Sequence, residues 1–330
     1  MLGCSIATAG GLTGMADFRA RLSPGGFGPV VHGFVVGAFP VGCLVGCVLA
    51  GRFADTLGLI RSMLMAAISA CVGISIQIGT ISSWPQFAAG KLVEGFAIGA
   101  LSVITPMYHA ETAPASIRAM VTVSFQIMVV SGILLAQLVI YGTSNIPNSL
   151  SWRLPLALEI LIAVPLGIGS FFLPESPRLL LSQDREQEAR VVIAKLNDVD
   201  VFHPTVQDQV QAFHQKSIEA KSQEQLKRCE LFTAPAMARR LLIGIMLQAA
   251  RHRSAALAIA TAANWTVNAA IGISTSHILA KIHFKYGYFF AASCLALAFG
   301  VWRFLIEPKD RAMDEIDQLY LEKADARKAR

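Results

Sequence analysis

Charged residues are scarce in this sequence: Asp, Glu, Lys and Arg make up only 15% of its 330 residues. A soluble domain has about 25% charged residues, and a disordered chain depends on charge and low hydrophobicity to stay solvated. Hydrophobic residues make up 54% of this chain, and its mean hydropathy is +0.53. The composition therefore excludes an ordinary soluble domain and extended disorder, and it indicates a membrane protein.

Metal-ligand clusters and catalytic motifs are also lacking. Cys43 and Cys47 share a helical spacing, but no His or carboxylate accompanies them, and of the six cysteines all but Cys229 lie inside apolar segments. We interpret them as small apolar side chains rather than disulfides or metal ligands. The apolar segments contain no paired carboxylates, no H-E-x-x-H string and no nucleophile motif. This argues against a membrane-embedded enzyme, and the sequence predicts no cofactor.

Long apolar runs dominate what remains. A run of 18 or more apolar residues can cross a bilayer. Residues 1–14 are apolar but too short to span, and they lack the basic start of a signal peptide, so we interpret them as the second half of a first span. One of the long runs contains Lys91 and Glu94. In chain order the predicted spans are about 30–50, 62–81, 86–110, 119–141, 154–173, 255–279 and 286–306.

Basic residues indicate the orientation of these spans. Arg and Lys in alternate short loops mark the cytoplasmic side, which places both termini in the cytoplasm. The net charge of +6 lies mainly in such loops and tails, so nucleic-acid binding is not predicted. The expected parts are an N-terminal transmembrane bundle, a cytoplasmic helical insert, an incomplete C-terminal bundle and a cytoplasmic tail, at residues 1–180, 181–238, 239–306 and 307–330.

Residues 239–253 break the pattern. Ten apolar residues, LLIGIMLQAA, lie between Arg239-Arg240 and Arg251-His252-Arg253. Ten helical residues reach about 15 Å, half of a bilayer, and both basic flanks favour the cytoplasm. Either this segment dips into the membrane and returns, or the chain is joined here across a missing part.

Several strings, in one order along the chain, resemble the sugar porters of the major facilitator superfamily, and fungal monosaccharide transporters most of all. They are GRFADTLGLIR, PMYHAETAPASIRA, SFQIMVVSGILLAQ, SWRLPLALE with FFLPESPRLLL, AALAIATAANWTVNAAIGISTSHI and IEPKDRAMDEID. The resemblance implies an all-α membrane protein with the major facilitator fold. Its six-helix N-terminal bundle would be nearly complete, and its C-terminal bundle would be reduced to about two spans and a stub.

The resemblance also offers an account of residues 239–253. In the family, the segment LLIGIMLQAA opens the seventh helix, whereas here it is followed by the approach to the eleventh. The rest of helix seven, helices eight and nine, and most or all of helix ten are therefore expected to be absent, together with the start of helix one. The expected chain is a truncated transporter of about eight spans.

The resemblance assigns sugar binding to two helices. Gln126 matches the fifth-helix glutamine that binds sugar in the family, and Asn264 and Asn268 match its eleventh-helix site, where Trp265 could stack on a sugar ring. Amides suit a polyol because each supplies two donors and an acceptor. From its position alone, Gln126 has the alternative of an interhelical hydrogen bond.

Charged residues at the predicted cytoplasmic ends of the spans form a second set. The resemblance implies that they form ion pairs that latch the two halves of the transporter while the pore faces outward. Their alternative role is that of solvated loop charges that satisfy helix ends. We expect Glu111 to approach Arg253 and Glu175 to approach Arg118. The whole set is Arg52, Asp55, Glu111, Arg118, Glu175, Arg178, Arg253 and Glu307.

The predicted function is transport of a hexose-type monosaccharide across the plasma membrane by alternating access, impaired in this chain by the missing helices. The predicted partners are a sugar and the lipid bilayer, and the sequence gives no prediction of an oligomeric state. Ser5 stands where proton-coupled members of the family carry an aspartate, and a hydroxyl does not titrate near neutral pH, which puts proton coupling through that site in doubt. The alternative function is that of a non-transporting sugar sensor or an inert truncated product.

Overall fold

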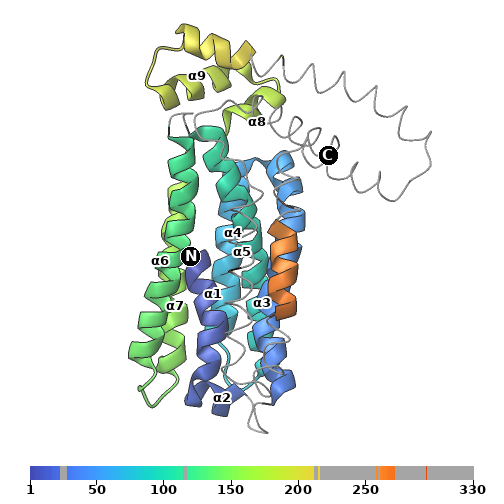
Figure 1. Cartoon of the computed structure of the whole chain (residues 1–330), viewed down its shortest axis with the longest axis vertical. Coiled ribbons are helices and arrows are strands. Elements are labelled where there is room, and N and C mark those ends of the chain that lie inside the picture. Colours follow the sequence, from blue (N-terminus) through green and yellow to red (C-terminus); the bar gives the residue numbers. More distant parts are fainter. Residues whose placement is uncertain are drawn as a thin grey trace, which may run out of the picture. The chain divides into compact units, whose positions relative to one another are not determined.

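The computed structural model describes residues 1–22, 28–113, 117–211, 215, 258, 261–271 and 295. These residues form helices and the turns between them, with no strand among them (Figure 1). Residues 204–211 and 261–271 are helical. The other helices are α1 (Leu2–Gly11), α2 (Ala16–Leu22), α3 (Pro29–Leu57), α4 (Leu59–Ile78), α5 (Trp84–Thr112), α6 (Arg118–Thr143), α7 (Leu150–Ser170), α8 (Pro177–Ser182) and α9 (Glu186–Asn197), with a 3₁₀ turn, η1 (Leu12–Gly14), after α1.

Five helices, α3 to α7, are long and apolar enough to cross a membrane. They correspond to the five spans predicted before residue 180, which confirms that part of the prediction. The apolar N-terminal residues form the short helix α1 and the turn η1. Of the two later spans, the structure describes helical residues 261–271 within the first, and nearly all of the second lies outside the described residues.

The connection between α3 and α4 is tighter than predicted. We expected a loop carrying Arg52 and Asp55, but α3 continues through both residues to Leu57. Thr56 Oγ1 donates to the carbonyl of Arg52 at 2.8 Å, within this last stretch of helix. The turn is made by Gly58 alone, with a φ of 95° that only glycine adopts without strain. The prediction of a loop was wrong because charged residues end an apolar run without ending the helix.

The two best-packed helices, α3 and α5, are in backbone contact. A Cβ atom added to Gly46 would lie 2.1 Å from the carbonyl oxygen of Phe96, and one added to Gly99 would lie 2.1 Å from that of Cys43. Glycine is therefore required at both positions for this approach. Small residues allow such close crossings of membrane helices, where packing rather than hydrophobicity drives association.

The remaining helices pack around this pair. Helix α4 packs against α5 and α7, and α1 packs against α6. Gly3 of α1 lies against the backbone of α6: a Cβ atom added to it would lie 2.0 Å from the carbonyl oxygen of Val129. All the labelled elements and residues 261–271 belong to one compact unit, Met1–His277. The short helix α1 thus lies against α6 within the bundle (Figure 1).

A small second core lies where α7 leads into α8, and we call this part of the molecule the α8 end (Figure 1). Ser176 precedes α8, and its side chain accepts from the backbone N–H of Leu179, as a helix cap does. Pro177 at the first helical position is also typical of a helix start. The core itself joins α8, α9 and residues 204–211 through Leu180, Leu181, Ala189, Ile193, Ala194, Val206 and Val210.

Candidate functional site

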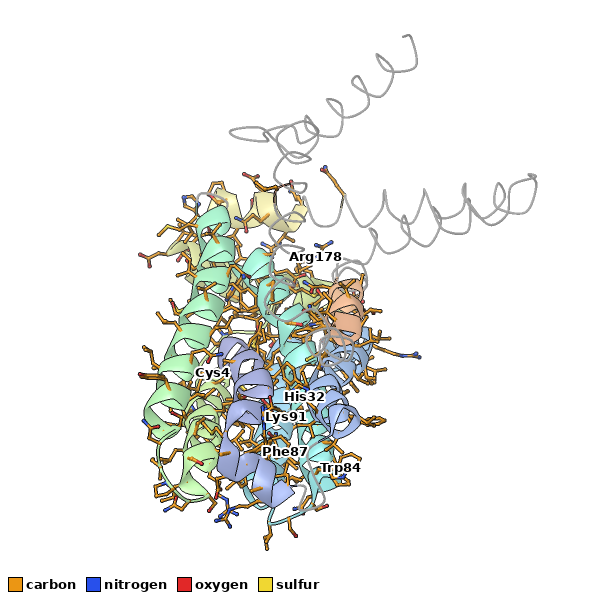
Figure 2. The ribbon with its side chains drawn as sticks, turned by 60° about the horizontal axis from the view of Figure 1, so that its bottom comes forward. Cys4, His32, Trp84, Phe87, Lys91 and Arg178 are labelled. Carbon is orange, nitrogen blue, oxygen red and sulfur yellow. The ribbon has the colours of Figure 1, made fainter. Side chains whose placement is uncertain are left out.

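Among the residues that the structure describes, three acidic or basic side chains are fully buried inside the bundle. Lys91 and Glu94 lie three residues apart on α5, Glu159 lies on α7, and each has an exposed fraction of 0%. Lys91 Nζ is 2.9 Å from Glu94 Oε2. Figure 2 shows Lys91 within the bundle, away from Arg178 at the α8 end. Ionisable groups inside membrane helices are costly and usually functional, so these three form the first candidate site.

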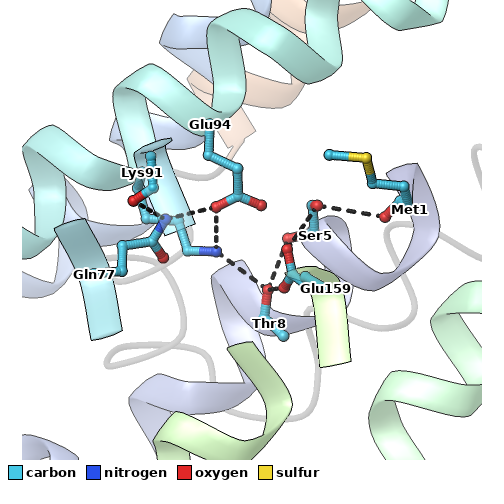
Figure 3. Close-up of polar contacts among 8 residues, drawn as sticks. Met1, Ser5, Thr8, Gln77, Lys91, Glu94 and Glu159 are labelled. Atoms are coloured by element: carbon cyan, nitrogen blue, oxygen red, sulfur yellow. Dashed lines mark hydrogen bonds and ion pairs between the residues drawn. The ribbon is translucent and has the colours of Figure 1, made fainter. Parts of the chain in front are cut away.

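Two hydroxyl groups of α1 hold the second carboxylate (Figure 3). Thr8 Oγ1 donates to Glu159 Oε1 and accepts from Lys91 Nζ at 3.1 Å. Ser5 Oγ donates to Glu159 Oε2 at 2.9 Å. The carboxylate of α7 is therefore attached to α1 through both of its oxygens.

Gln77 of α4 reaches the first carboxylate. Its Nε2 donates to Glu94 Oε2 at 2.8 Å and to the carbonyl of Gly73 at 3.2 Å. Gln77 Oε1 and Glu94 Oε1 are buried and have no hydrogen-bond partner among the described residues. Four helices thus meet in what we call the buried cluster: Ser5, Thr8, Gln77, Lys91, Glu94 and Glu159.

Sequence reasoning found only part of this cluster. Lys91 and Glu94 were visible as interruptions of an apolar run, but no role was predicted for them, and Glu159 was not singled out. The signal for Glu159 was available, because a lone carboxylate in an apolar span seldom faces lipid. Which side chains meet it depends on how α1, α5 and α7 pack, and a single sequence does not contain that information.

The predicted sugar-binding amides are on the surface of the described unit. Gln126 of α6 is exposed and has no hydrogen-bond partner among the described residues. Asn264 and Asn268 are also exposed, and Asn268 Nδ2 donates to the backbone carbonyl of Asn264 at 3.0 Å and to its side-chain oxygen. The structure brings the two asparagines together, and all three amides keep groups that a ligand could bind.

Trp265 differs from its neighbours, because it is only 8% exposed. Its ring meets that of Phe39 on α3 edge to face, with centroids 5.8 Å apart. Its Nε1 donates to Ser102 Oγ on α5 at 3.4 Å. Trp265 therefore attaches residues 261–271 to α3 and α5, and in this structure its ring is not presented for stacking on a sugar.

We expect the Trp265–Ser102 hydrogen bond to contribute modestly to stability. Replacing Trp265 by Phe keeps an aromatic ring but removes the N–H donor, and should lower the free energy of unfolding by about 0.5–1.5 kcal/mol. The measurement is denaturation of the purified chain in detergent. In a Ser102→Ala background the same replacement should cost much less, because the partner is already gone. An equal cost in both backgrounds would contradict this bond.

Two predicted latch residues meet at the α8 end. Glu175 Oε1 accepts from the backbone N–H of Ser176 at 3.0 Å and from that of Leu59, the first residue of α4, at 3.1 Å. Ser176 Oγ in turn donates to Glu111 Oε2. The two acids are thus linked through Ser176, which sequence reasoning missed. Glu175 also caps the positive end of α4, which is the helix-end role considered as the alternative.

The other members of the latch set are described only in part. Arg52 and Asp55 are exposed on the last turns of α3, and Arg178 is half-buried on α8. Arg118 begins α6, but its side chain lies outside what the structure describes, as do Arg253 and Glu307 entirely. Both expected ion pairs, Glu111 with Arg253 and Glu175 with Arg118, therefore fall outside the described residues and stay predictions.

We expect the cap provided by Glu175 to be measurable. Replacing Glu175 by Ala removes the acceptor for two backbone N–H groups and should cost about 1–2 kcal/mol of stability. Thermal unfolding in detergent would measure the loss. Glu188 is the matched control, because its side chain is 58% exposed in a pair with Arg185 on α9. Glu188→Ala should change stability by less than about 0.5 kcal/mol, and equal effects of the two replacements would contradict the cap.

Comparison with known families identifies the chain. The family model described as "Sugar (and other) transporter" matches residues 18–252 and residues 247–320. The two matched stretches meet at residues 247–252, where the sequence predicts a join. Together they cover most of the chain.

The curated relatives that the chain matches are named as glucose or hexose transporters. The chain is 32% identical to the low-affinity glucose transporter HXT3 of Saccharomyces cerevisiae, over 75% of this chain and 45% of that protein. It is 33% identical to the high-affinity glucose transporter ght5 of Schizosaccharomyces pombe, over 63% of this chain and 39% of that protein. The chain thus spans less than half the length of these relatives.

Solved structures agree on the fold. The proton:xylose symporter XylE, a major facilitator superfamily protein, gives a TM-score of 0.71 at 19% identity and covers 96% of both chains. An inward-open conformation of the xylose transporter XylE from E. coli gives a TM-score of 0.68 at the same identity and coverage. The chain therefore belongs to the sugar transporter family, whose members are carriers rather than enzymes, and it has the fold of the major facilitator superfamily.

Proposed function

We propose that this sequence encodes a carrier of hexose-type monosaccharides that works by alternating access in the plasma membrane. The observation that carries the proposal is the match of the sugar transporter family to most of the chain. Within the described residues, helices α3 to α7 are long and apolar enough to cross a membrane. The names of the relatives, which are glucose and hexose transporters, support a hexose as the substrate class.

The proposed sugar-binding residues are Gln126, Asn264 and Asn268. Sugars are polyols, and an exposed amide offers both donors and an acceptor to a hydroxyl group. Gln126 has no protein partner among the described residues, and the two asparagines are exposed. Trp265, whose ring is buried, would position the helix that carries Asn264 and Asn268.

The proposed gate is the α8 end, which we place in the cytoplasm with both termini. Alternating access requires contacts that hold in one state and break in the other. Glu111 and Glu175 are linked there through Ser176, and their proposed ion-pair partners, Arg253 and Arg118, would join them when the pore faces outward. Arg52, Asp55, Arg178 and Glu307 complete the proposed set.

We expect this 330-residue chain to transport sugar poorly by itself. Transport in this fold needs two halves that rock around one central site, and the chain matches less than half of the length of its relatives. Sequencing the transcript across the codons for Ala250 and Arg251 should reveal a longer form that supplies the second half. A single continuous transcript would favour the alternative, a non-transporting sensor or an inert product.

Uptake and binding together test the proposal. Radiolabelled glucose uptake should be near background in hexose-transporter-null yeast that express this chain, with the Saccharomyces cerevisiae relative as the positive control. Saturable uptake by this chain would contradict the impairment. The longer form should bind glucose, and glucose should therefore raise its unfolding temperature. Replacing Gln126 by Ala should abolish that rise. Absence of any glucose effect on the longer form would contradict the assignment of the sugar.

A further inference from the structure

The α8 end contains a cavity that the proposed sugar site and gate do not use. Its volume is about 330 Å³, which lies within the range of small-molecule sites. The walls come from the last turn of α3, the first turn of α4, the link between α7 and α8, and the helices α8 and α9. Figure 1 shows α8 and α9 together at this end of the bundle. A small molecule bound there would contact all of these segments.

Arg61 brings a positive charge to this cavity. It lies in the first turn of α4, lines the cavity and is exposed. Its guanidinium has no hydrogen-bond or ion-pair partner among the described residues. The first turn of a helix is also its positive end, where a cation is unfavourable and an anion is favoured. The wall formed by α4 therefore presents five free donors in a region that attracts an anion.

The other charges that line the cavity are already compensated. Arg185 and Glu188 form a bidentate pair, in which Nε and Nη2 of the arginine donate to the two carboxylate oxygens at 2.8 and 2.6 Å. Glu175 Oε1 accepts from the backbone N–H of Leu59 at 3.1 Å, so its charge is balanced by the positive end of α4. Among the described residues that line the cavity, Arg61 is therefore the charge that lacks a counterpart.

The remaining polar groups of the lining suit hydroxyl groups. The amide of Gln183 is exposed, and neither it nor Glu175 Oε2 has a hydrogen-bond partner among the described residues. A ligand made only of acceptors would be repelled by the carboxylates of Glu175 and Glu188, whereas a hydroxyl can donate to them and can also accept from an amide. Apolar side chains such as Leu57 and Val192 complete the walls and can contact the C–H groups of a compact ring.

We propose that this cavity binds a phosphate monoester of a small polyol, such as a sugar phosphate. The phosphate oxygens accept from Arg61, and the hydroxyl groups donate to Glu175 Oε2 and bond to the amide of Gln183. A guanidinium binds phosphate and carboxylate alike, but a phosphate monoester carries a charge of about −1.5 to −2 near neutral pH and is attracted more strongly. The bound molecule would join the first turn of α4 to α8 and α9, whether or not the chain transports a sugar.

Calorimetric titration of the purified full chain in phosphatidylcholine nanodiscs tests the site, with glucose 6-phosphate as the probe. We expect saturable binding at neutral pH. Inorganic phosphate should bind at least about tenfold more weakly, because it offers the cavity no ring and few hydroxyl groups. An excess of glucose should not displace the probe. Absence of saturable binding, equal binding of inorganic phosphate, or displacement by glucose would overturn the proposal.

Variants locate the bound molecule. Arg61→Gln should weaken binding of glucose 6-phosphate by about tenfold or more, because it removes the charged donor, and Gln183→Ala should weaken it less. The matched control is Arg190→Gln, whose arginine pairs with Glu186 on α9 at 2.7 Å and does not line the cavity. Gln126→Ala, at the proposed sugar site, should also leave binding unchanged, which separates this proposal from the proposed function. Equal losses in the Arg61 and Arg190 variants would refute the site.

A membrane lipid is the other source of a phosphate group, and the same titration distinguishes it. Nanodiscs that contain phosphatidate as well as phosphatidylcholine should bind glucose 6-phosphate with an affinity within about threefold, since salt screens the charge of the lipid surface. If phosphatidate displaced the probe from the unmodified chain, Arg61 would bind a lipid headgroup, and the assignment of a soluble polyol phosphate would be wrong.

Discussion

Replacing Lys91 by Met should destabilise the chain by about 3–5 kcal/mol, the range found when one partner of a buried ion pair is removed. Lys91 is fully buried, and its ammonium contacts Glu94 Oε2 at 2.9 Å and Thr8 Oγ1 at 3.1 Å. Met has a similar volume, so the loss would come from charge and hydrogen bonding rather than from a cavity. Chemical denaturation in detergent micelles, followed by circular dichroism, would measure it.

Two other variants show whether charge is the cause. Lys195→Met removes a lysine that is exposed on α9, and should be nearly neutral, as expected for a surface charge. In the double variant Lys91→Met, Glu94→Gln the carboxylate is replaced together with its partner, which should recover a large part of the lost stability. If the double variant were as unstable as the single one, the stabilising role of the ion pair would be refuted.

The membrane helices could be predicted from the sequence because a single physical requirement determines them. A segment that crosses a bilayer needs about 20 mostly apolar residues, and α3 to α7 all satisfy it. Helix ends were harder to predict. At the end of α3 the backbone hydrogen bonding continues through Arg52 and Asp55, and only Gly58 interrupts it. The position of each span therefore follows from the polarity of the sequence, whereas the end of α3 depends on the backbone conformation at Gly58.

The candidate sugar-binding residues were likewise predictable from the sequence only in part. Asn264 and Asn268 are four residues apart, so their shared face and mutual contact follow from helix geometry. Trp265 adjoins Asn264 in sequence, but successive residues in a helix point about 100° apart. Its ring consequently faces α3 and α5 while the amides stay exposed. Sequence adjacency therefore does not determine which of these side chains share a face.

The sequence indicates that α3 and α5 each form a close helix contact, but it does not indicate that they contact each other. Gly42 and Gly46 are four residues apart, as are Gly95 and Gly99, and such spacing favours a close helix crossing. The pattern does not identify the partner, since any glycine face could meet any other. In the structure these four residues meet each other's helices, because added Cβ atoms would lie 2.1–2.3 Å from carbonyl oxygens of the facing backbone.

Replacing Gly99 by Ala should therefore cost about 3 kcal/mol, at the upper end of the range for overpacked cores. The new methyl group would lie 2.1 Å from the carbonyl oxygen of Cys43 and 2.6 Å from its Cα. These are backbone atoms, so no side-chain rotation relieves the clash, and α3 and α5 must separate. Thermal unfolding of the purified chain, together with its yield from the membrane, would measure the effect.

Gly169 and Gly142 provide the matched controls, because they lie on α7 and α6 with nothing within 4 Å of an added Cβ atom. Alanine at Gly169 should be neutral or stabilising by up to about 1 kcal/mol, since it lowers the entropy of the unfolded helix segment without a clash. Gly46→Ala should resemble Gly99→Ala, because it meets the carbonyl of Phe96 across the same contact. If alanine were tolerated equally at Gly99 and Gly169, α3 and α5 would not be in backbone contact, and the packing on which the buried cluster rests would have to be revised.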